Sequence, residues 1–353
     1  MEANIIDIET SIRKLIERAQ FATSNFLIIF LANVKDRTLN SNDYDDTSVL
    51  TEFLSMEEYQ ELLTSLQNFG FYVVTYFNTE EFMADYLNGD YINDNLIIFE
   101  GTQKGIGHAR DTLIPAFCDL QNLLHTGPNA YVNSVCINKY NWTKLLKEHN
   151  ILVPNSWRFD ETGWLNSYPP NDILLIAKPN YECASIGIHK DSVSYLTPNY
   201  ISYLYKMAHK YNQSLIVQEF IPGYEVEVPI IINKLEVCIL PPIVLSQSEQ
   251  VCMNYNFLDF DNIYFDDYRF SLLKNVNKSW THSIKECVKK ICNILELERY
   301  TRIDFRITTN GDFYVTDINS YPHIVSHSSF GYAFDQLNIG HENILPCLIG
   351  NII

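Results

Sequence analysis

The dipeptide Asn310-Gly311 constrains the fold of this chain more than any other feature. A two-residue type I′ turn needs positive φ at both central residues, and Asn-Gly between two apolar runs is its strongest sequence signal. Counting outward from this turn predicts that Asp304 lies opposite Asp317 and that Arg302 lies opposite Asn319. Because side chains alternate along a strand, these four polar side chains would share one face of the hairpin.

The other face of the predicted hairpin belongs in the core, and its residues are Ile303, Phe305, Ile307, Tyr314, Thr316 and Ile318. On the polar face, two carboxylates placed directly opposite each other would repel. A divalent cation removes that repulsion, and Mg²⁺ takes one or two carboxylates from a protein when phosphate supplies other ligands. We therefore interpret Asp304, Asp317 and Asn319 as metal ligands. The alternative is a solvated hairpin face, because a slip of one residue would separate the acids.

The segment around this hairpin resembles the C-terminal signature of ATP-grasp ligases, specifically the D-alanine–D-alanine ligase group. Its RIDF, DIN, Pro322 and HS elements follow one another in the order of the family's R-x-D-F, E-x-N, P-G and H-S motifs. The resemblance implies ATP as a cofactor and two Mg²⁺ ions, with Mn²⁺ as an alternative ion. It also implies that Arg302 stabilises a tetrahedral intermediate, and that Ser328 and Ser329 bind the carboxylate of the second substrate.

The same resemblance implies which residues bind the nucleotide. The segment from Lys178 to Gly187 is similar to the family's K-P-x-x-E-G-S-S-V-G loop over the triphosphate, although Cys183 and Ala184 replace its Gly and Ser. The compact ammonium of Lys178 suits a phosphate. An edge strand that enters a turn at Pro222-Gly223 would offer its backbone to adenine. The residues matched to the nucleotide site are Lys139, Lys178, Glu182, Ser185, Gln218, Glu219, Phe220, Ile221 and Glu225; Glu227 is expected to be solvated.

Two departures from the family pattern concern the substrate end of the site. The family carries a loop lysine that contacts the γ-phosphate, but no lysine lies between Lys234 and Lys274. Either Arg269 or Lys274 substitutes for it, or other cations meet the charge. Where the family has Pro-Gly, whose glycine N–H contributes to an oxyanion hole, this chain has His323 after the proline.

The first third of the chain alternates predicted strands with predicted helices. We expect strands at 26–34, 71–77 and 96–100, and helices at 1–20, 56–69, 80–87 and 111–124. This order indicates a parallel sheet covered by helices, with ligands at the carboxyl ends of its strands. The resemblance assigns the loop after the third strand to the edge of the substrate pocket, which would make its cations Lys104 and Arg110 candidates for holding a substrate carboxylate. The family's glycine-rich opening and catalytic Ser-x-Glu are not visible here.

The fold class that we predict is α/β, with α+β character in the C-terminal half. The resemblance implies an ATP-grasp fold with a Rossmann-like N-terminal substrate domain over 1–133. A central ATP-grasp lid subdomain is expected over 134–233, and a C-terminal catalytic subdomain over 234–353. Further along the chain, 172–188 is predicted to form strand, turn and strand, whereas 198–211 and 281–297 are predicted helices.

Charge and composition restrict the partners of this chain. The net charge of −18 disfavours binding to nucleic acid or to an anionic membrane. No apolar run reaches the roughly 18 residues that a membrane-spanning helix needs. The eight cysteines include no C-x-x-C pair, which favours reduced thiols in a cytoplasm. We therefore expect a soluble cytoplasmic protein with small amino-acid or carboxylic-acid substrates and, as an option, a homodimeric assembly.

The resemblance predicts an ATP-dependent ligase that joins a carboxylate to an amine through an acyl phosphate and releases ADP and phosphate. The two departures favour a specialised amino-acid or peptide ligase over D-alanine–D-alanine ligase itself. Two other classes stay open at this point: a phosphotransferase that stops at a phosphorylated product, and a non-catalytic nucleotide-binding protein. Lys178, Arg302, Asp304 and Asn319 argue against the last class, because mere binding would not require them.

Overall fold

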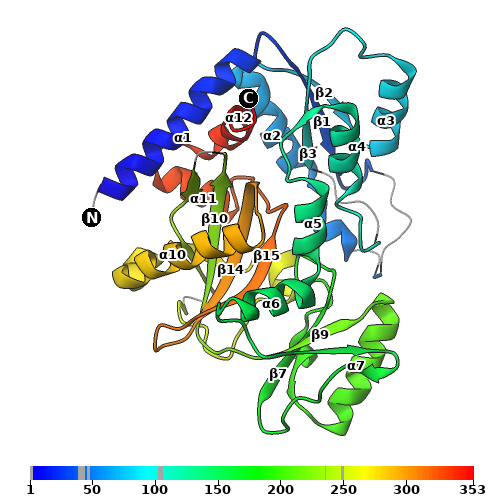
Figure 1. Ribbon diagram of the computed structural model, residues 1–353, viewed down its shortest axis with the longest axis vertical. Coiled ribbons are helices and arrows are strands. Elements are labelled where there is room, and N and C mark those ends of the chain that lie inside the picture. Colours follow the sequence, from blue (N-terminus) through cyan, green and yellow to red (C-terminus); the bar gives the residue numbers. More distant parts are fainter. Residues whose placement is uncertain (1–2, 39–43, 46–47, 102–105, 235, 248–249) are drawn as a thin grey trace.

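The computed structural model describes residues 3–353 except 39–43, 46–47, 102–105, 235 and 248–249 (Figure 1). Three sheets organise these residues: a four-stranded parallel sheet, a five-stranded antiparallel sheet and a six-stranded antiparallel sheet. The parallel sheet and the five-stranded sheet lie at opposite ends of the molecule, with the six-stranded sheet between them (Figure 1). Among the described residues, we find no helix whose length and apolar character would let it cross a membrane.

The N-terminal sheet confirms the predicted alternation of strands and helices. Its strand order is β2-β1-β3-β4 and every pairing is parallel. Both β1 and β3 are almost fully buried, as expected for apolar strands covered by helices on both faces. The elements of this region are α1 (Ala3–Ala22), β1 (Leu27–Ala32), η1 (Val49–Glu52), α2 (Met56–Phe69), β2 (Tyr72–Tyr76), α3 (Thr79–Asn88), β3 (Leu96–Gly101), α4 (Leu113–Gln121) and β4 (Leu124–His125).

The five-stranded sheet corrects two expectations. Strand β9 lies between β5 and β7 and is therefore not an edge strand. The predicted second strand before Ile188 does not form, because Ala184, Ser185 and Gly187 all have positive φ. Helix α7 forms at the residues predicted for it, 198–211, and its apolar side chains pack against the sheet in one core cluster. The elements are β5 (Ser156–Asp160), β6 (Gly163–Trp164), β7 (Leu174–Pro179), η2 (Lys190–Ser192), β8 (Val193–Tyr195), α7 (Pro198–Tyr211) and β9 (Leu215–Glu219).

The six-stranded sheet includes β10, which we had placed in the central subdomain. Strand β10 pairs with β14 along its whole length and packs against α10 in one core, which the helices α5 and α6 also enter. The elements are α5 (Ala130–Ile137), α6 (Lys139–Glu148), β10 (Tyr224–Ile232), β11 (Val237–Ile239), β12 (Ile243–Ser246), α8 (Phe260–Tyr264), β13 (Arg269–Leu272), α9 (Leu273–Val276), α10 (Lys278–Ile294), β14 (Arg299–Ile307) and β15 (Phe313–Asn319).

The end of the chain returns to the N-terminal region. Helix α12 lies beside α1 (Figure 1), and their apolar side chains share one buried cluster with β1 and α2. The elements are α11 (Ser329–Gln336), η3 (His341–Asn343) and α12 (Ile344–Gly350). Through this packing, the segment that follows β15 contacts the parallel sheet. Helices from the first and the last part of the chain therefore contribute to the same hydrophobic core.

The hairpin of β14 and β15 confirms the register predicted at its polar end. Arg302 pairs with Asn319, and Asp304 pairs with Asp317. Nearer the turn the register differs by one residue, because the connection is a three-residue loop closed by bonds from the Gly311 N–H to the Thr308 carbonyl and from the Thr308 N–H to the Asp312 carbonyl.

A bulge then compensates for the longer turn. The register shifts between Asp304 and Phe305, which leaves Thr316 unpaired in the ladder. Val315 therefore occupies the core, whereas Tyr314 and Thr316, which we had predicted there, do not. The longer turn and the bulge offset each other, so the two acids still meet.

Gly311 allows the first direct test of this turn. Its φ is +91°, and a Cβ there would lie 2.8 Å from Nε1 of Trp280. Gly89, at the end of α3, has a φ of +93° but no atom within 4 Å of a Cβ. We expect Gly89→Ala to cost about 1 kcal/mol of unfolding free energy from φ alone. Gly311→Ala should cost roughly 1–3 kcal/mol more, because Trp280 must move. Equal losses in urea unfolding would contradict this account of the turn.

Candidate active site

A cavity of about 340 Å³ is bordered by residues of all three sheets. The residues that the sequence analysis assigned to the nucleotide, the metal, the tetrahedral intermediate and the second substrate all line it, whereas the further candidates Arg110, Arg269 and Lys274 do not. The assigned residues that line it are Lys139, Lys178, Glu182, Ser185, Gln218, Glu219, Phe220, Ile221, Glu225, Arg302, Asp304, Asp317, Asn319, Ser328 and Ser329. They come from segments almost two hundred residues apart in the chain.

Two cations neutralise the opposed acids of the hairpin. Nζ of Lys139 lies 2.7 Å from Oδ1 of Asp317. The guanidinium of Arg302 makes two bonds of 2.8 Å to the carboxylate of Asp304, and lies 3.3 Å from Glu227. Glu227 is thus paired, contrary to the expectation that it is solvated. Lys139, in the first turn of α6, is buried with 6% of its surface exposed, so it faces the site instead of solvent.

The two opposed carboxylates differ in their electrostatic surroundings. Burial raises the pKa of Asp304, the charges of Glu227 and Asp317 add to the shift, and Arg302 opposes it. Burial alone would also raise the pKa of Asp317, but Lys139 and Lys178 hold it below its usual value. Burial lowers the pKa of Lys178, and Lys139 contributes to that shift. Asp317 is therefore the more firmly ionised acid.

The donor set at this point fits Mg²⁺. Within the described part of the chain, no group of three or more His, Cys, Asp or Glu side chains is placed to hold a metal ion. Mg²⁺ does not need such a group, since it takes one or two carboxylates and completes its shell with phosphate oxygens and water. Asp304 and Asp317 supply the carboxylates. Asn319 supplies an amide oxygen, which the N–H of Tyr321 holds in place at 2.9 Å.

Arg306 is a site residue that the sequence analysis missed. Its guanidinium lies 2.7 Å from the Glu225 carboxylate and 5.2 Å from the ring centre of Phe220. It also donates to the carbonyls of Ile221 and Asn254. The signal was present, because Arg306 follows Asp304 by two residues and period-two alternation places both on one face.

Arg110, a candidate for holding a substrate carboxylate, is instead bound to other protein groups. Its side chain is only 2% exposed and lies 3.3 Å from Glu52 and 3.4 Å from Glu182. It also donates to the Tyr181 carbonyl at 2.8 Å. Arg110 therefore ties the N-terminal region to the loop that follows β7. Lys104, the other candidate in this segment, falls outside the described residues.

Glu182 and Ser185 are already bonded within the protein. The Glu182 carboxylate accepts hydrogen bonds from Tyr44 at 3.0 Å and from Gln213 at 2.7 Å. The Ser185 hydroxyl donates to the carbonyl of Leu258 at 3.3 Å. Their roles toward a nucleotide stay predictions, since both line the cavity while serving these internal contacts.

Two serines begin helix α11 at the opposite end of the cavity. The Ser328 hydroxyl caps the helix by accepting from the Gly331 N–H at 3.0 Å and donating to the Val325 carbonyl at 2.7 Å. The Ser329 hydroxyl is buried and has no hydrogen-bond partner among the described residues. A helix N-terminus attracts anions, so this free hydroxyl is suited to a carboxylate.

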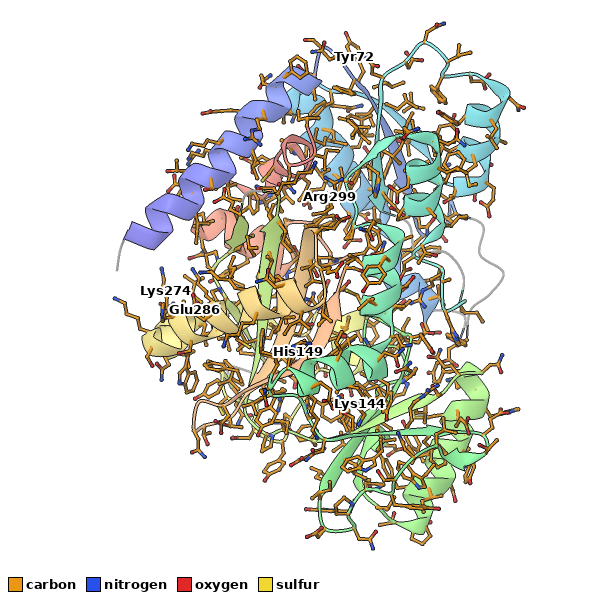
Figure 2. All side chains as sticks on the ribbon, in the orientation of Figure 1. Tyr72, Lys144, His149, Lys274, Glu286 and Arg299 are labelled. Carbon is orange, nitrogen blue, oxygen red and sulfur yellow. The ribbon has the colours of Figure 1, made fainter. Side chains whose placement is uncertain are left out.

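The segment between Leu245 and Lys274 supplies no basic side chain to the cavity among its described residues. Arg269 and Lys274 are both exposed and neither lines the cavity, so neither replaces the family's loop lysine. Figure 2 shows Lys274 near the outer end of α10. The segment instead contributes apolar, aromatic and acidic side chains: Leu245, Phe257, Leu258, Ile263, Tyr264, Asp266, Tyr268 and Phe270.

His323, which stands where the family has glycine, lines the cavity. Its Nδ1 lies 3.8 Å from Oε1 of Glu58 in α2. Burial lowers the pKa of His323, and the charges of Arg302 and Lys35 add to the shift while Glu58 opposes it. A neutral imidazole thus occupies the substrate end of the cavity.

Comparisons with known proteins agree with this geometry. Residues 131–350 match the family described as "D-ala D-ala ligase C-terminus". The chain is 24% identical over 279 residues to D-alanine–D-alanine ligase B of Clostridium perfringens, covering 73% of this chain and 84% of that protein. It is 26% identical over 252 residues to D-alanine–D-alanine ligase of Borrelia duttonii, covering 68% and 66% respectively.

Solved structures agree on the fold. The crystal structure of D-alanine–D-alanine ligase from Bacillus anthracis complexed with ATP aligns with a TM-score of 0.67 at 15% identity, over 93% of this chain and 97% of that chain. The VanG D-Ala:D-Ser ligase from Enterococcus faecalis aligns with a TM-score of 0.63 at 14% identity, over 93% and 100%. The fold and the site therefore define an ATP-grasp ligase.

Within that class, the chain belongs to the D-alanine–D-alanine ligase family, because the family match covers more than half of its length. The resemblance stated from the motifs is thus confirmed, as is the prediction of an ATP-grasp fold with a parallel N-terminal sheet.

The buried acids around Arg110 predict a pH dependence of stability. Burial raises the pKa of Glu52 from 4.5 to about 7, with Glu182 and Asp111 adding to the shift and Arg110 opposing it. The native state keeps this proton up to about pH 7, whereas the unfolded chain releases it near pH 4.5. Rising pH across that window therefore favours unfolding.

We expect the unfolding free energy of the wild type to fall over this window more steeply than that of Glu52→Gln. Urea titrations at several pH values measure the difference. Glu57→Gln, at an exposed position in the same region, is the matched control and should keep the wild-type slope. Identical slopes in all three proteins would show that Glu52 ionises normally.

Proposed function

We propose that this chain joins amino acids or related small carboxylic acids to an amine through an acyl phosphate, with ADP and phosphate as the other products. It is an enzyme, an ATP-dependent ligase that forms carbon–nitrogen bonds, in keeping with its family. The observation that carries the proposal is the convergence of Lys139, Lys178 and Arg302 on the opposed acids Asp304 and Asp317.

The chemistry explains why such a cluster is needed. A carboxylate is a poor electrophile, so it must first accept a phosphoryl group from ATP before an amine can attack it. Both the phosphoryl transfer and the amine attack build negative charge on oxygen. Cations that are already aimed at those oxygens lower both barriers without reorganising.

Each residue of the cluster has a defined part in this proposal. Lys139 and Lys178 bind phosphate oxygens, and Glu225 accepts the ribose hydroxyls. Asp304, Asp317 and Asn319 hold Mg²⁺, for which we propose two ions with Mn²⁺ as an alternative. The bound metal would neutralise phosphate oxygens during transfer.

Arg302 and the two serines act on the acyl and amine substrates. Arg302, held in place by Asp304 and Glu227, stabilises the oxyanion of the tetrahedral intermediate. Ser328 and Ser329 bind the carboxylate of the amine substrate at the N-terminus of α11. The unpartnered hydroxyl of Ser329 supports this assignment.

The substrate end of the cavity favours a specialised acid over D-alanine. D-alanine is a zwitterion whose side chain is a single methyl group, so beyond partners for its two charges it needs only a small apolar pocket. This end instead carries charged and aromatic groups, among them Lys35, Glu58, Asp266, Tyr268 and His323. D-alanine–D-alanine ligation is the second candidate, supported by the names of the relatives. We also propose that the protein acts in a reducing cytoplasm and forms a homodimer. The absence of disulfides among its eight cysteines supports the reducing compartment.

Phosphate release from ATP across a panel of acid and amine pairs tests the proposal. We expect release that needs both an acid and an amine, with the ligated product identified by mass spectrometry. Release with an acid alone would instead favour a phosphotransferase, and turnover confined to D-alanine would favour the second candidate. No release above background with any pair would refute the ligase proposal.

Asp304→Asn tests the metal cluster within the same assay. We expect turnover to fall at least roughly 100-fold, since one of two carboxylate ligands loses its charge. Asp312→Asn is the matched control, because Asp312 lies in the exposed turn of the same hairpin. Full activity in Asp304→Asn would show that the reaction does not depend on Asp304 as a metal ligand.

A further inference from the structure

The N-terminal sheet presents its ligand-binding edge to the cavity. In the strand order β2-β1-β3-β4, β2 pairs with one side of β1 and β3 pairs with its other side. The carboxyl ends of β1 and β3 therefore flank the point where the strand order reverses, which is where parallel sheets bind ligands. Lys35 follows β1 by three residues, and Glu100 and Gly101 end β3. All three line the cavity.

Lys35 is a cation that lines this cavity and forms no ion pair with any described residue. The Lys and Arg side chains that line it, in the described part of the chain, are Lys35, Lys139, Lys178, Arg302 and Arg306. Lys139, Arg302 and Arg306 each form an ion pair with a carboxylate. Lys178 and Lys35 form none with the described residues, and they lie on different walls. Lys178 belongs to β7, whereas Lys35 belongs to the N-terminal sheet.

The contacts of Lys35 hold it between the N-terminal region and α8 at the border of the cavity. Its backbone N–H donates to the Leu54 carbonyl at 2.9 Å, which holds the residue beside η1. Its ammonium lies 5.9 Å from the ring centre of Tyr264 in α8. Lys35, Arg302 and His323 all line the same cavity, with Lys35 following β1 and Arg302 on β14.

Arg302 is less available to a substrate than Lys35. Its Nε and Nη2 atoms are bonded to Asp304, and Glu227 lies close to the same guanidinium. A carboxylate entering this region needs a cation that is not already neutralised, since leaving water costs an anion several kcal/mol unless it is paired. The segment between Leu245 and Lys274 supplies none among its described residues.

We propose that Lys35 binds the reacting carboxylate of the acid substrate. This inference deepens the proposed function and rests on it. Lys35 holds the carboxylate oxygens at the switch point of the N-terminal sheet, facing Arg302 and the metal-binding acids. A lysine suits this task because its ammonium is a compact charge with three donors that rotate freely.

Direct binding of the acid is the first test. Calorimetry follows the acids of the panel as they bind to the protein loaded with a non-hydrolysable ATP analogue and Mg²⁺. We expect Lys35→Met to weaken acid binding roughly 10- to 100-fold, the range for losing a hydrogen bond to a charged group. The affinity for the ATP analogue should change less than about twofold, and Lys35→Arg should restore most of the loss.

Lys274→Met is the matched control, because Lys274 is an exposed lysine on the segment that borders the cavity. It should bind the acid as the wild type does. Steady-state assays add a second readout: Lys35→Met should raise the KM for the acid and leave the KM values for ATP and amine unchanged. Equal weakening of acid and nucleotide binding would indicate a general structural effect and overturn the proposal, as would unchanged acid binding.

The outcomes separate this inference from the proposed function. If the wild type binds an acid through Lys35 but releases no phosphate with any amine, the ligase proposal fails and the assignment of Lys35 stands. If the wild type turns over and Lys35→Met binds and uses the acid normally, the assignment of Lys35 fails alone. If the wild type binds no acid of the panel, the assignment of Lys35 is wrong whatever the turnover.

Discussion

The pairing of Asp304 opposite Asp317 on adjacent strands is the interaction on which the rest of the site depends. Two carboxylates on adjacent strands repel, and burial makes that repulsion more costly. Lys139 offsets it from α6, so the helix must stay against the hairpin. The backbone N–H of Lys139 also donates to the carbonyl of Asn180, one residue beyond β7. Lys139 thus holds helix α6 against both the hairpin of the six-stranded sheet and the carboxyl end of β7.

A second buried charge fixes the N-terminal region against this assembly. Arg110 forms ion pairs with both Glu52 and Glu182. Glu182 lies two residues after Asn180, whose carbonyl accepts the hydrogen bond from Lys139. Removing a buried cation from such a group leaves uncompensated charges, which is far costlier than losing a surface ion pair. The pairs Lys139–Asp317 and Arg110–Glu182 therefore both lie at the border of the cavity. Moving its walls apart would break these buried pairs, which costs free energy.

Local patterns were sufficient to predict that the two acids oppose each other, and the family resemblance named further residues that line the cavity, but neither predicted the long-range pairing. Alternation and the Asn310-Gly311 signal located Asp304 opposite Asp317, although the true turn is longer and a bulge at Thr316 compensates. No residue type marks where a strand takes an extra residue, so the sequence could not show this. The burial of Arg110 was equally hidden, because it depends on acids fifty-eight and seventy-two positions away that only the tertiary fold brings near.

Two of the differences from the family, the missing loop lysine and His323, concern the substrate end of the cavity, whereas Cys183 and Ala184 lie in the loop after β7. In the proposed reaction, Lys139, Lys178, Asp304 and Asp317 serve steps that any ATP-dependent ligation must perform, so substituting them is expected to abolish the reaction. The opposite wall, built from the N-terminal sheet and the segment after β12, only selects the acid and can change without loss of chemistry. His323, which follows β15, and Lys35, which forms no ion pair with the described residues, both line the cavity. A family member that changes substrate is therefore expected to alter this wall first, which is the pattern that these residues form.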